Sequence, residues 1–163
     1  MTVTHPTSRP SWLAPLILAA IILAIGFVIG WSTGPSIRGW YTTLEMPVFQ
    51  PPNWAFPVAW TILYIAMGVA GGLVVNRPAS PARSTALALF AVQLILNFAW
   101  SPVFFAAQSI LGALVIVVVL LLLVLATTAA FLRVDRLAGV LMLPYLAWVG
   151  FATLLNASIA VLN

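Results

Sequence analysis

The stretch "ILGALVIVVVLLLLVLATTAAFL" (residues 110–132) contains 23 residues, and none of them carries a charge. A helix of about 20 apolar residues is long enough to cross the hydrocarbon core of a bilayer. Because this stretch is apolar all round, we expect a transmembrane helix that forms a lipid-facing wall. Its hydroxyls, on Thr127 and Thr128, can bond back to carbonyls of the same helix.

The composition of the whole chain agrees with a membrane environment. Of its 163 residues, 64% are hydrophobic and only 5% are charged, whereas soluble domains carry about 25% charged residues. The absence of cysteine excludes disulfides and thiolate metal sites. The net charge of +4 is small and scattered, which argues against a nucleic-acid partner. We therefore predict one membrane domain with the lipid bilayer as its solvent.

Four further segments are long and apolar enough to span a bilayer, so we predict an all-α membrane protein, a bundle of five transmembrane helices. The predicted spans are residues 12–31, 54–76, 83–105, 109–132 and 137–162. We expect residues 1–11 to form a disordered tail before the domain of residues 12–163. The later links are short, so consecutive helices should be antiparallel. Only the first link, residues 32–53, is long.

The arginines predict how the chain crosses the membrane, because cytoplasmic loops carry an excess of positive residues. One side of the predicted bundle has a single arginine, Arg38. The other side has five, namely Arg9, Arg77, Arg83, Arg133 and Arg136. This asymmetry places the amino terminus in the cytoplasm. We expect an integral, multi-pass protein of a bacterial inner membrane, with the long link and the carboxyl terminus facing outward.

The long link and the start of the following span read "GWYTTLEMPVFQPPNWAFPVAW" (residues 39–60), with three tryptophans and four prolines. Prolines fix φ and reduce the disorder that is lost when a link closes over a ligand. Tryptophans offer wide stacking faces with few rotatable bonds. We interpret this stretch as a lid and rim over a pocket for a flat, apolar ligand. A plain plug at the membrane interface is the alternative.

The third span contains amides on one helix face. In "VQLILNFAWSPVFF" (residues 92–105), Gln93, Asn97 and Trp100 or Ser101 recur at i, i+4 and i+7 or i+8. Polar side chains in hydrocarbon need partners, so this face should point into the bundle. The amides either join helices by hydrogen bonds, as is common in membranes, or also present donors and acceptors to a ligand.

The fifth span carries a second such face, with Tyr145, Trp148, Ala152 and Asn156 at i, i+3, i+7 and i+11. Large rings followed by a small residue leave a notch that suits a flat guest. Packing against a neighbouring helix is the alternative, because Trp148 lies too deep for an interfacial aromatic belt.

The second span adds Trp60 and Tyr64, one turn apart. At its start, Trp54 fits a belt residue as well as a pocket wall.

Small residues spaced by four let helices approach closely, and two such pairs are Gly26 with Gly30 and Gly68 with Gly72. They serve either packing within the bundle or a homodimer. Asp135 is well placed to cap the start of the fifth helix.

The sequence offers no acid–base or haem-binding constellation. No span has an ionisable residue near its middle, although pumps and ion-coupled transporters usually need one. The only histidine lies in the tail, so no Ser/His/Asp set is available. We therefore expect no obligatory cofactor, no metal site and no catalytic residues, and a binding protein rather than an enzyme.

Three motifs together resemble the TspO/translocator-protein family, also called tryptophan-rich sensory proteins or peripheral-type benzodiazepine receptors. "WYTTLEMPVFQPPNWAFPVAWTILYIAM" is similar to the family's first link and second helix. "QLILNFAWSPVFF" is similar to its third helix, and "DRLAGVLMLPYLAWVGFATLLN" to its fifth. The resemblance covers residues 38–163.

This resemblance implies a five-helix bundle, usually dimeric, that binds porphyrin-type tetrapyrroles such as protoporphyrin IX and similar flat ligands. Carried over by position, the cavity would be lined by Trp60, Asn97, Trp148 and Ala152. The lid and rim would be formed by Trp40, Tyr41, Pro51, Trp54 and Phe56. Further wall residues would be Tyr64 and Gln93, and the two polar faces add Trp100, Tyr145 and Asn156.

The chain departs from the family pattern at Met46-Pro47-Val48-Phe49, where the family has Lys-Pro-x-Trp. The missing lysine leaves Arg38 as the only nearby cation for a ligand carboxylate. Binding or sensing of a porphyrin is the leading hypothesis. Light- or oxygen-dependent porphyrin degradation by the lid tryptophans, and a passive translocator or scaffold, are the alternatives.

Overall fold

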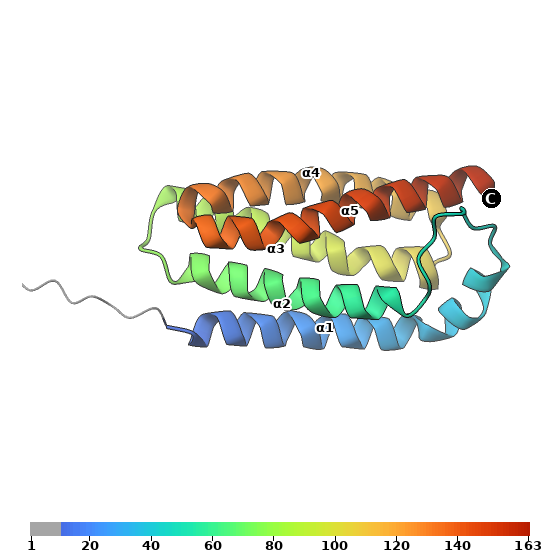
Figure 1. Cartoon of the computed structure of the whole chain (residues 1–163), viewed down its shortest axis with the longest axis horizontal. Coiled ribbons are helices and arrows are strands. Elements are labelled where there is room, and N and C mark those ends of the chain that lie inside the picture. Colours follow the sequence, from blue (N-terminus) through green and yellow to red (C-terminus); the bar gives the residue numbers. More distant parts are fainter. Residues whose placement is uncertain (1–10) are drawn as a thin grey trace, which may run out of the picture.

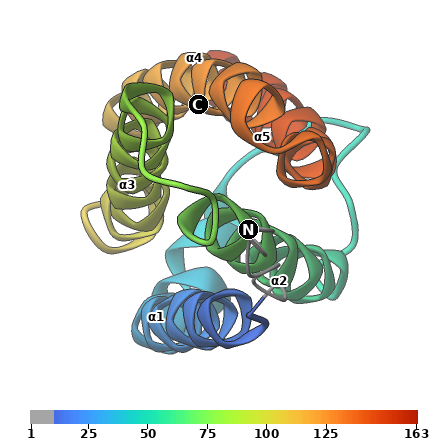
Figure 2. The same cartoon turned by 90° about the vertical axis from the view of Figure 1, so that its left-hand side faces the viewer.

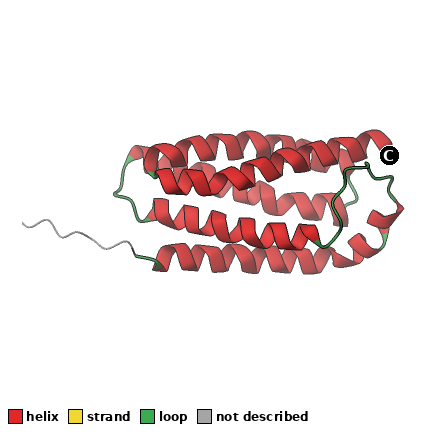
Figure 3. Ribbon diagram, in the orientation of Figure 1, coloured by secondary structure: helices red, strands yellow, loops and turns green. Residues whose placement is uncertain are grey.

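A computed structural model describes residues 11–163 of the chain, and all regular structure in that range is helical (Figure 3). Its elements are α1 (Leu13–Arg38), η1 (Trp40–Thr43), α2 (Ala55–Val75), α3 (Pro81–Ser101), η2 (Pro102–Ala106), α4 (Ile110–Val134) and α5 (Arg136–Leu162). Five helices are long and apolar enough to cross a membrane, with η2 extending the third span. The predicted all-α, five-helix fold is confirmed. The predicted tail, apart from Ser11, lies outside the described residues.

The five long helices lie side by side along one axis (Figure 1). Seen from the end, α3, α4 and α5 form an arc, and α2 lies between α5 and α1 (Figure 2). The most extensive contacts join α4 to α5, α1 to α2, and α3 to α4. Helix α1 therefore depends mainly on α2 for its place in the bundle.

Glycines allow α1 and α2 to approach closely. A methyl group added at Gly68 would overlap the backbone of Ala19, and one added at Gly72 would overlap the backbone of Pro15. This Gly68/Gly72 pair therefore serves packing within the bundle, which was one of the two interpretations of its spacing. The homodimer stays a prediction, and this pair supplies no face for it.

Helix α1 continues beyond the predicted end of the first span at residue 31, as far as Arg38. Proline often ends a helix because it lacks an amide hydrogen and clashes with the preceding turn, yet Pro35 lies within α1. The first seven residues assigned to the link, 32–38, are therefore helical. This extension carries α1 up to the lid, and η1 follows directly after Gly39.

At the same end of the bundle, α3 passes into the single π-helical turn η2 at Pro102. The Ala107 amide donates to the Pro102 carbonyl over 2.9 Å. Such turns widen a helix locally and occur frequently at functional sites. Here the turn carries Phe104 and Phe105 toward η1.

Helix α4 is not only a lipid-facing wall, as its uniform apolarity suggested. One face is exposed, for example at Leu111, Val115 and Leu122. The opposite face is buried against α3 and α5 and includes Ala113, Val117, Leu120, Val124, Thr127, Thr128 and Phe131. The two threonines donate to carbonyls of their own helix over 2.7 Å, as predicted.

The turn between α4 and α5 is held by Asp135. One carboxylate oxygen accepts from the Ala138 amide over 2.9 Å, which confirms the predicted helix cap. The other accepts from Arg77 Nε over 2.7 Å, an ion pair that joins the end of α2 to the start of α5. Burial by itself raises the pKa of this carboxyl, but the bonds from Ala138 and Arg77 hold the pKa below its usual value.

Candidate functional site

A cavity of about 1090 Å³ lies within the bundle toward the end that carries the long link. All five long helices contribute to its lining, together with η1, η2 and the link. Ligand pockets are typically about 300–1,000 Å³ and mostly apolar with a few polar groups. The size and lining of this cavity suit a large, flat, apolar molecule.

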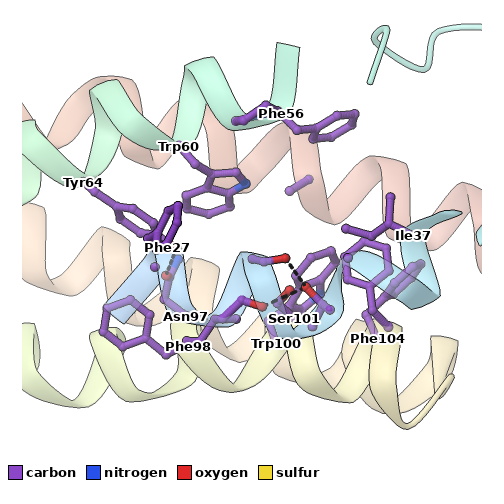
Figure 4. Close-up of a pocket in the computed structure, with 18 of the residues that line it drawn as sticks. Phe27, Ile37, Phe56, Trp60, Tyr64, Asn97, Phe98, Trp100, Ser101 and Phe104 are labelled. Atoms are coloured by element: carbon purple, nitrogen blue, oxygen red, sulfur yellow. Dashed lines mark hydrogen bonds between the residues drawn. The ribbon is translucent and has the colours of Figure 1, made fainter. Parts of the chain in front are cut away.

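Aromatic rings from α2 and α5 form one wall of the cavity, and Figure 4 shows those of α2, Phe56, Trp60 and Tyr64. The Trp60 and Tyr64 ring centroids are 5.2 Å apart on α2, one turn from each other. Trp60 meets Trp148 of α5 edge to face, with centroids 6.3 Å apart and planes at 83°. Phe56 approaches Trp148 in the same manner at 6.0 Å. The two indoles present differently oriented faces at one corner of the hollow.

A chain of hydrogen bonds crosses the bundle beside this wall. The Tyr64 hydroxyl donates to Asn97 Oδ1 over 3.1 Å, and Asn97 Nδ2 donates to the Tyr145 hydroxyl over 3.0 Å. Tyr145 in turn donates to Gln93 Oε1 over 2.8 Å. Tyr64 and Asn97 line the cavity, whereas Tyr145 and Gln93 are fully buried behind it. These hydrogen bonds join α2, α3 and α5, which was one of the two interpretations of the amides. Asn97 also borders the cavity.

A second set of side-chain hydrogen bonds lies closer to the link. Trp100 Nε1 donates to Asn156 Oδ1 over 3.1 Å, and Asn156 Nδ2 donates to the Ile110 carbonyl over 3.2 Å. The Trp100 ring also stacks on Phe104, with centroids 5.1 Å apart and planes at 20°. These contacts fix the orientation of the indole at the border between α3 and η2.

The segment that we expect to form the lid begins at η1, where Tyr41 is buried. Its ring meets Phe104 at 6.0 Å and Phe105 at 5.4 Å, both edge to face. Its hydroxyl accepts a hydrogen bond of 3.3 Å from Gln50, and burial raises the pKa of this phenol. Because Gln50 lies late in the link, this bond closes the link on itself.

The far end of the chain also holds the link. Asn163 Oδ1 accepts from the Glu45 amide over 3.0 Å, and Asn163 Nδ2 donates to the Glu45 carbonyl over 3.1 Å. Two bonds between one side chain and one backbone unit form a clamp. The link is therefore anchored at η1 and again near its middle.

Nine of the fourteen residues predicted from the sequence line the cavity: Tyr41, Phe56, Trp60, Tyr64, Asn97, Trp100, Trp148, Ala152 and Asn156. Gln93 and Tyr145 stand behind the lining. The remaining three, Trp40, Pro51 and Trp54, belong to the link and its junction with α2. The Trp40 ring meets Phe104 edge to face, with centroids 5.7 Å apart. Trp54 is 69% exposed and outside the lining, as fits a belt residue.

Helix α1 supplies a wall of the cavity that was not predicted from the sequence. Its lining residues include Leu23, Gly26, Phe27, Gly30, Thr33, Gly34, Ile37 and Arg38. A methyl group at Gly26 would overlap the Tyr64 ring, whereas one at Gly30 would meet no atom within 4 Å. The signal was the spacing of Gly26, Gly30 and Gly34, which leaves one face of α1 without side chains.

Comparison with known proteins gives a consistent result. Residues 9–162 match the sequence model described as the TspO/MBR family. The chain is 42% identical to the tryptophan-rich protein TspO of Chlorobaculum tepidum, over 88% of this chain and 91% of that protein. It is 44% identical to the tryptophan-rich sensory protein of Cereibacter sphaeroides, over 76% and 77%. It is 36% identical to the translocator protein of Homo sapiens, over 90% and 88%.

Proposed function

The chain belongs to the TspO/MBR family of membrane proteins, and we propose that its cavity binds a porphyrin-type tetrapyrrole such as protoporphyrin IX. The observation that carries this proposal is the meeting of Trp60 and Trp148 at one corner of a hollow of about 1090 Å³. Aromatic rings attract one another in offset or edge-to-face geometry. A flat macrocycle can therefore stack on one indole while its edge meets the other.

The two ends of such a ligand have matching surroundings. Its apolar edge fits the part of the cavity bordered by Phe98, Val117 and Leu120. Its carboxylates fit the end that carries Arg38, the cation of the lining. This orientation keeps charge out of the hydrocarbon, where it is costly. In this orientation Arg38 binds the ligand carboxylate in place of the family lysine, which is Met46 in this chain.

Fluorescence titration of the purified protein with protoporphyrin IX tests the proposal. The double variant Trp60→Ala/Trp148→Ala should bind at least tenfold more weakly, because stacking of one base-like ring on an aromatic side chain contributes about 1–3 kcal/mol. Trp54→Ala is the matched control, because that indole is exposed and lies outside the lining. Equal affinity of the double variant and the control would overturn the proposal.

We also propose that the amino terminus faces the cytoplasm of a bacterial inner membrane. Arg77, Arg83, Arg133 and Arg136 lie at the end of the bundle opposite the lid, whereas Arg38 lies at the lid end (Figure 1). Positive residues favour the cytoplasmic side. A periplasmically active reporter fused after Asn163 should therefore be active. The same reporter fused between Arg77 and Arg83 should be inactive, and the reverse pattern would contradict this orientation.

A further inference from the structure

Two aromatic residues of α1 that line the cavity have high solvent exposure. Phe27 is 69% exposed and Trp31 is 77% exposed, and both belong to the lining. Helix α1 packs closely on α2 but makes few contacts with α3, which leaves the cavity open to the bundle surface between α1 and α3. This surface faces lipid, because α1 is a spanning helix.

The packing of α1 explains where this opening lies. Its buried residues in the half near the amino end, Pro15, Ala19 and Ile22, are followed by none before Thr33. In the half near the lid, Gly30 faces open space. Phe98 of α3 and Phe105 of η2 belong to the same lining. We define the groove as Phe27, Gly30, Trp31 and Gly34 of α1 with Phe98 and Phe105.

A cation stands at the lid end of this groove. The Arg38 guanidinium folds back over Gly34. Among the described residues Arg38 forms no ion pair, and the acid at this end of the bundle, Glu45, forms none either. The other described arginines lie at the opposite end of the bundle. The charge beside the groove is therefore positive and free to accept an anion.

The groove has the length of a lipid chain. Arg38 lies eleven positions after Phe27, which corresponds to a rise of about 17 Å in an α-helix. Each leaflet contributes about half of a hydrocarbon core that is about 30 Å thick. A lipid whose headgroup lies at the level of Arg38 would therefore extend its chain to the level of Phe27.

We propose that this groove is a lipid seat, in which one anionic phospholipid of the leaflet at the lid end rests its phosphate on Arg38 and inserts one acyl chain past Gly30. The apolar side chains of the groove surround the acyl chain, and the Arg38 guanidinium favours a negative headgroup. The seat overlaps the cavity, so another ligand must displace this chain or share the space with it. The inference does not depend on tetrapyrrole binding.

Native mass spectrometry of the full chain, released from bilayers of equal parts phosphatidylglycerol and phosphatidylcholine, tests the seat. One phosphatidylglycerol should be retained per chain. Arg38→Gln should reduce the preference for phosphatidylglycerol by about fivefold, since one basic residue near an anionic surface contributes about 1 kcal/mol. Arg38→Lys should retain the preference. Arg133→Gln, which removes an arginine at the opposite end, is the charge control.

A second pair of variants tests the groove itself. Gly30→Leu fills the groove and should lose the retained lipid while Arg38 is still present. Gly150→Leu is the matched control, because a side chain at Gly150 also meets open space but lies outside the lining. Far-UV circular dichroism establishes that each variant is folded. Retention of phosphatidylglycerol by Gly30→Leu, an unchanged lipid preference in Arg38→Gln, or equal retention of the two lipids by the unchanged chain would overturn the proposal.

Discussion

Asn97 donates a hydrogen bond of 3.0 Å to the hydroxyl of Tyr145 and thereby joins α3 to α5 directly behind the cavity. Asn97 accepts from Tyr64, and Tyr145 donates to Gln93, so three helices share one chain of bonds. In a medium without water, a broken link in such a chain leaves its partners unsatisfied. These hydrogen bonds therefore hold both the wall of the site and the packing of the bundle in place.

Tyr145→Phe should destabilise the protein by about 1–3 kcal/mol, because it leaves buried polar groups of Asn97 and Gln93 without their partner. Unfolding by denaturing detergent, followed by circular dichroism, measures this loss. Tyr41→Phe is the control, since it removes one longer bond of 3.3 Å near the lid. A smaller loss for Tyr145→Phe than for Tyr41→Phe would contradict the importance of the chain.

The close approach of α1 and α2 predicts a size limit at Gly68. Gly68→Ala should cost about 1–3 kcal/mol, because its methyl group overlaps the Ala19 backbone, which cannot move aside cheaply. The same substitution at Gly150 should cause no loss, since it meets open space and alanine favours a helix. Thermal unfolding in detergent compares the two. Equal melting temperatures would show that α1 is not held at this glycine.

Asp135 predicts a pH dependence of stability. A pKa held below its usual value means that the ionised carboxylate stabilises the fold at neutral pH, and that this contribution disappears as the pH falls below about 4 toward the lowered pKa. Asp135→Asn keeps a good capping side chain but loses the charge. Because Arg77 is 54% exposed, its pair contributes only about 0.2–1 kcal/mol.

Unfolding free energies of the unchanged chain and of Asp135→Asn, measured between pH 8 and pH 3, test this sign. The difference should be constant down to about pH 5 and should shrink below about pH 4. Glu45→Gln, which removes the other acid of the chain, is the charge control. A difference that grew as the pH fell would contradict the assignment.

The clamp at Glu45 predicts how the link moves. Asn163→Ala removes both bonds to the Glu45 backbone, so the Glu45 amide should exchange its hydrogen faster. Hydrogen-exchange mass spectrometry of peptides that cover residues 44–50 measures this change. Peptides from α4 should be unaffected. An unchanged exchange rate at Glu45 would mean that the clamp does not hold the link.

The bundle could be predicted from the sequence because long apolar segments in lipid have few alternatives to a helix. The wall formed by Trp60, Tyr64, Asn97 and Trp148 could also be predicted, since polar and aromatic residues repeat there with helical spacing. The resemblance to the TspO/translocator-protein family pointed to the same side chains. The helical spacing of these residues was enough to predict that they share a site, and all four line one cavity in the structure.

The contribution of α1 could not be predicted in the same way. Its lining is formed mostly by glycines and by apolar residues that are typical of any membrane helix. The predicted span also ended at residue 31, seven residues before the helix ends at Arg38. Trp54 shows the opposite problem, because a rim tryptophan and an interfacial one have the same local pattern. Which face of a connector turns inward depends on tertiary contacts such as those of Tyr41 with Phe105.

We propose above that a flat tetrapyrrole occupies the hollow where α2 and α5 present their indoles. An experimental structure of the chain with protoporphyrin IX tests it most directly. We expect macrocycle density against Trp60 and Trp148, with the carboxylates directed toward Arg38. Density for the macrocycle only on the outer, lipid-facing surface, with the hollow empty or filled by side chains, would contradict it.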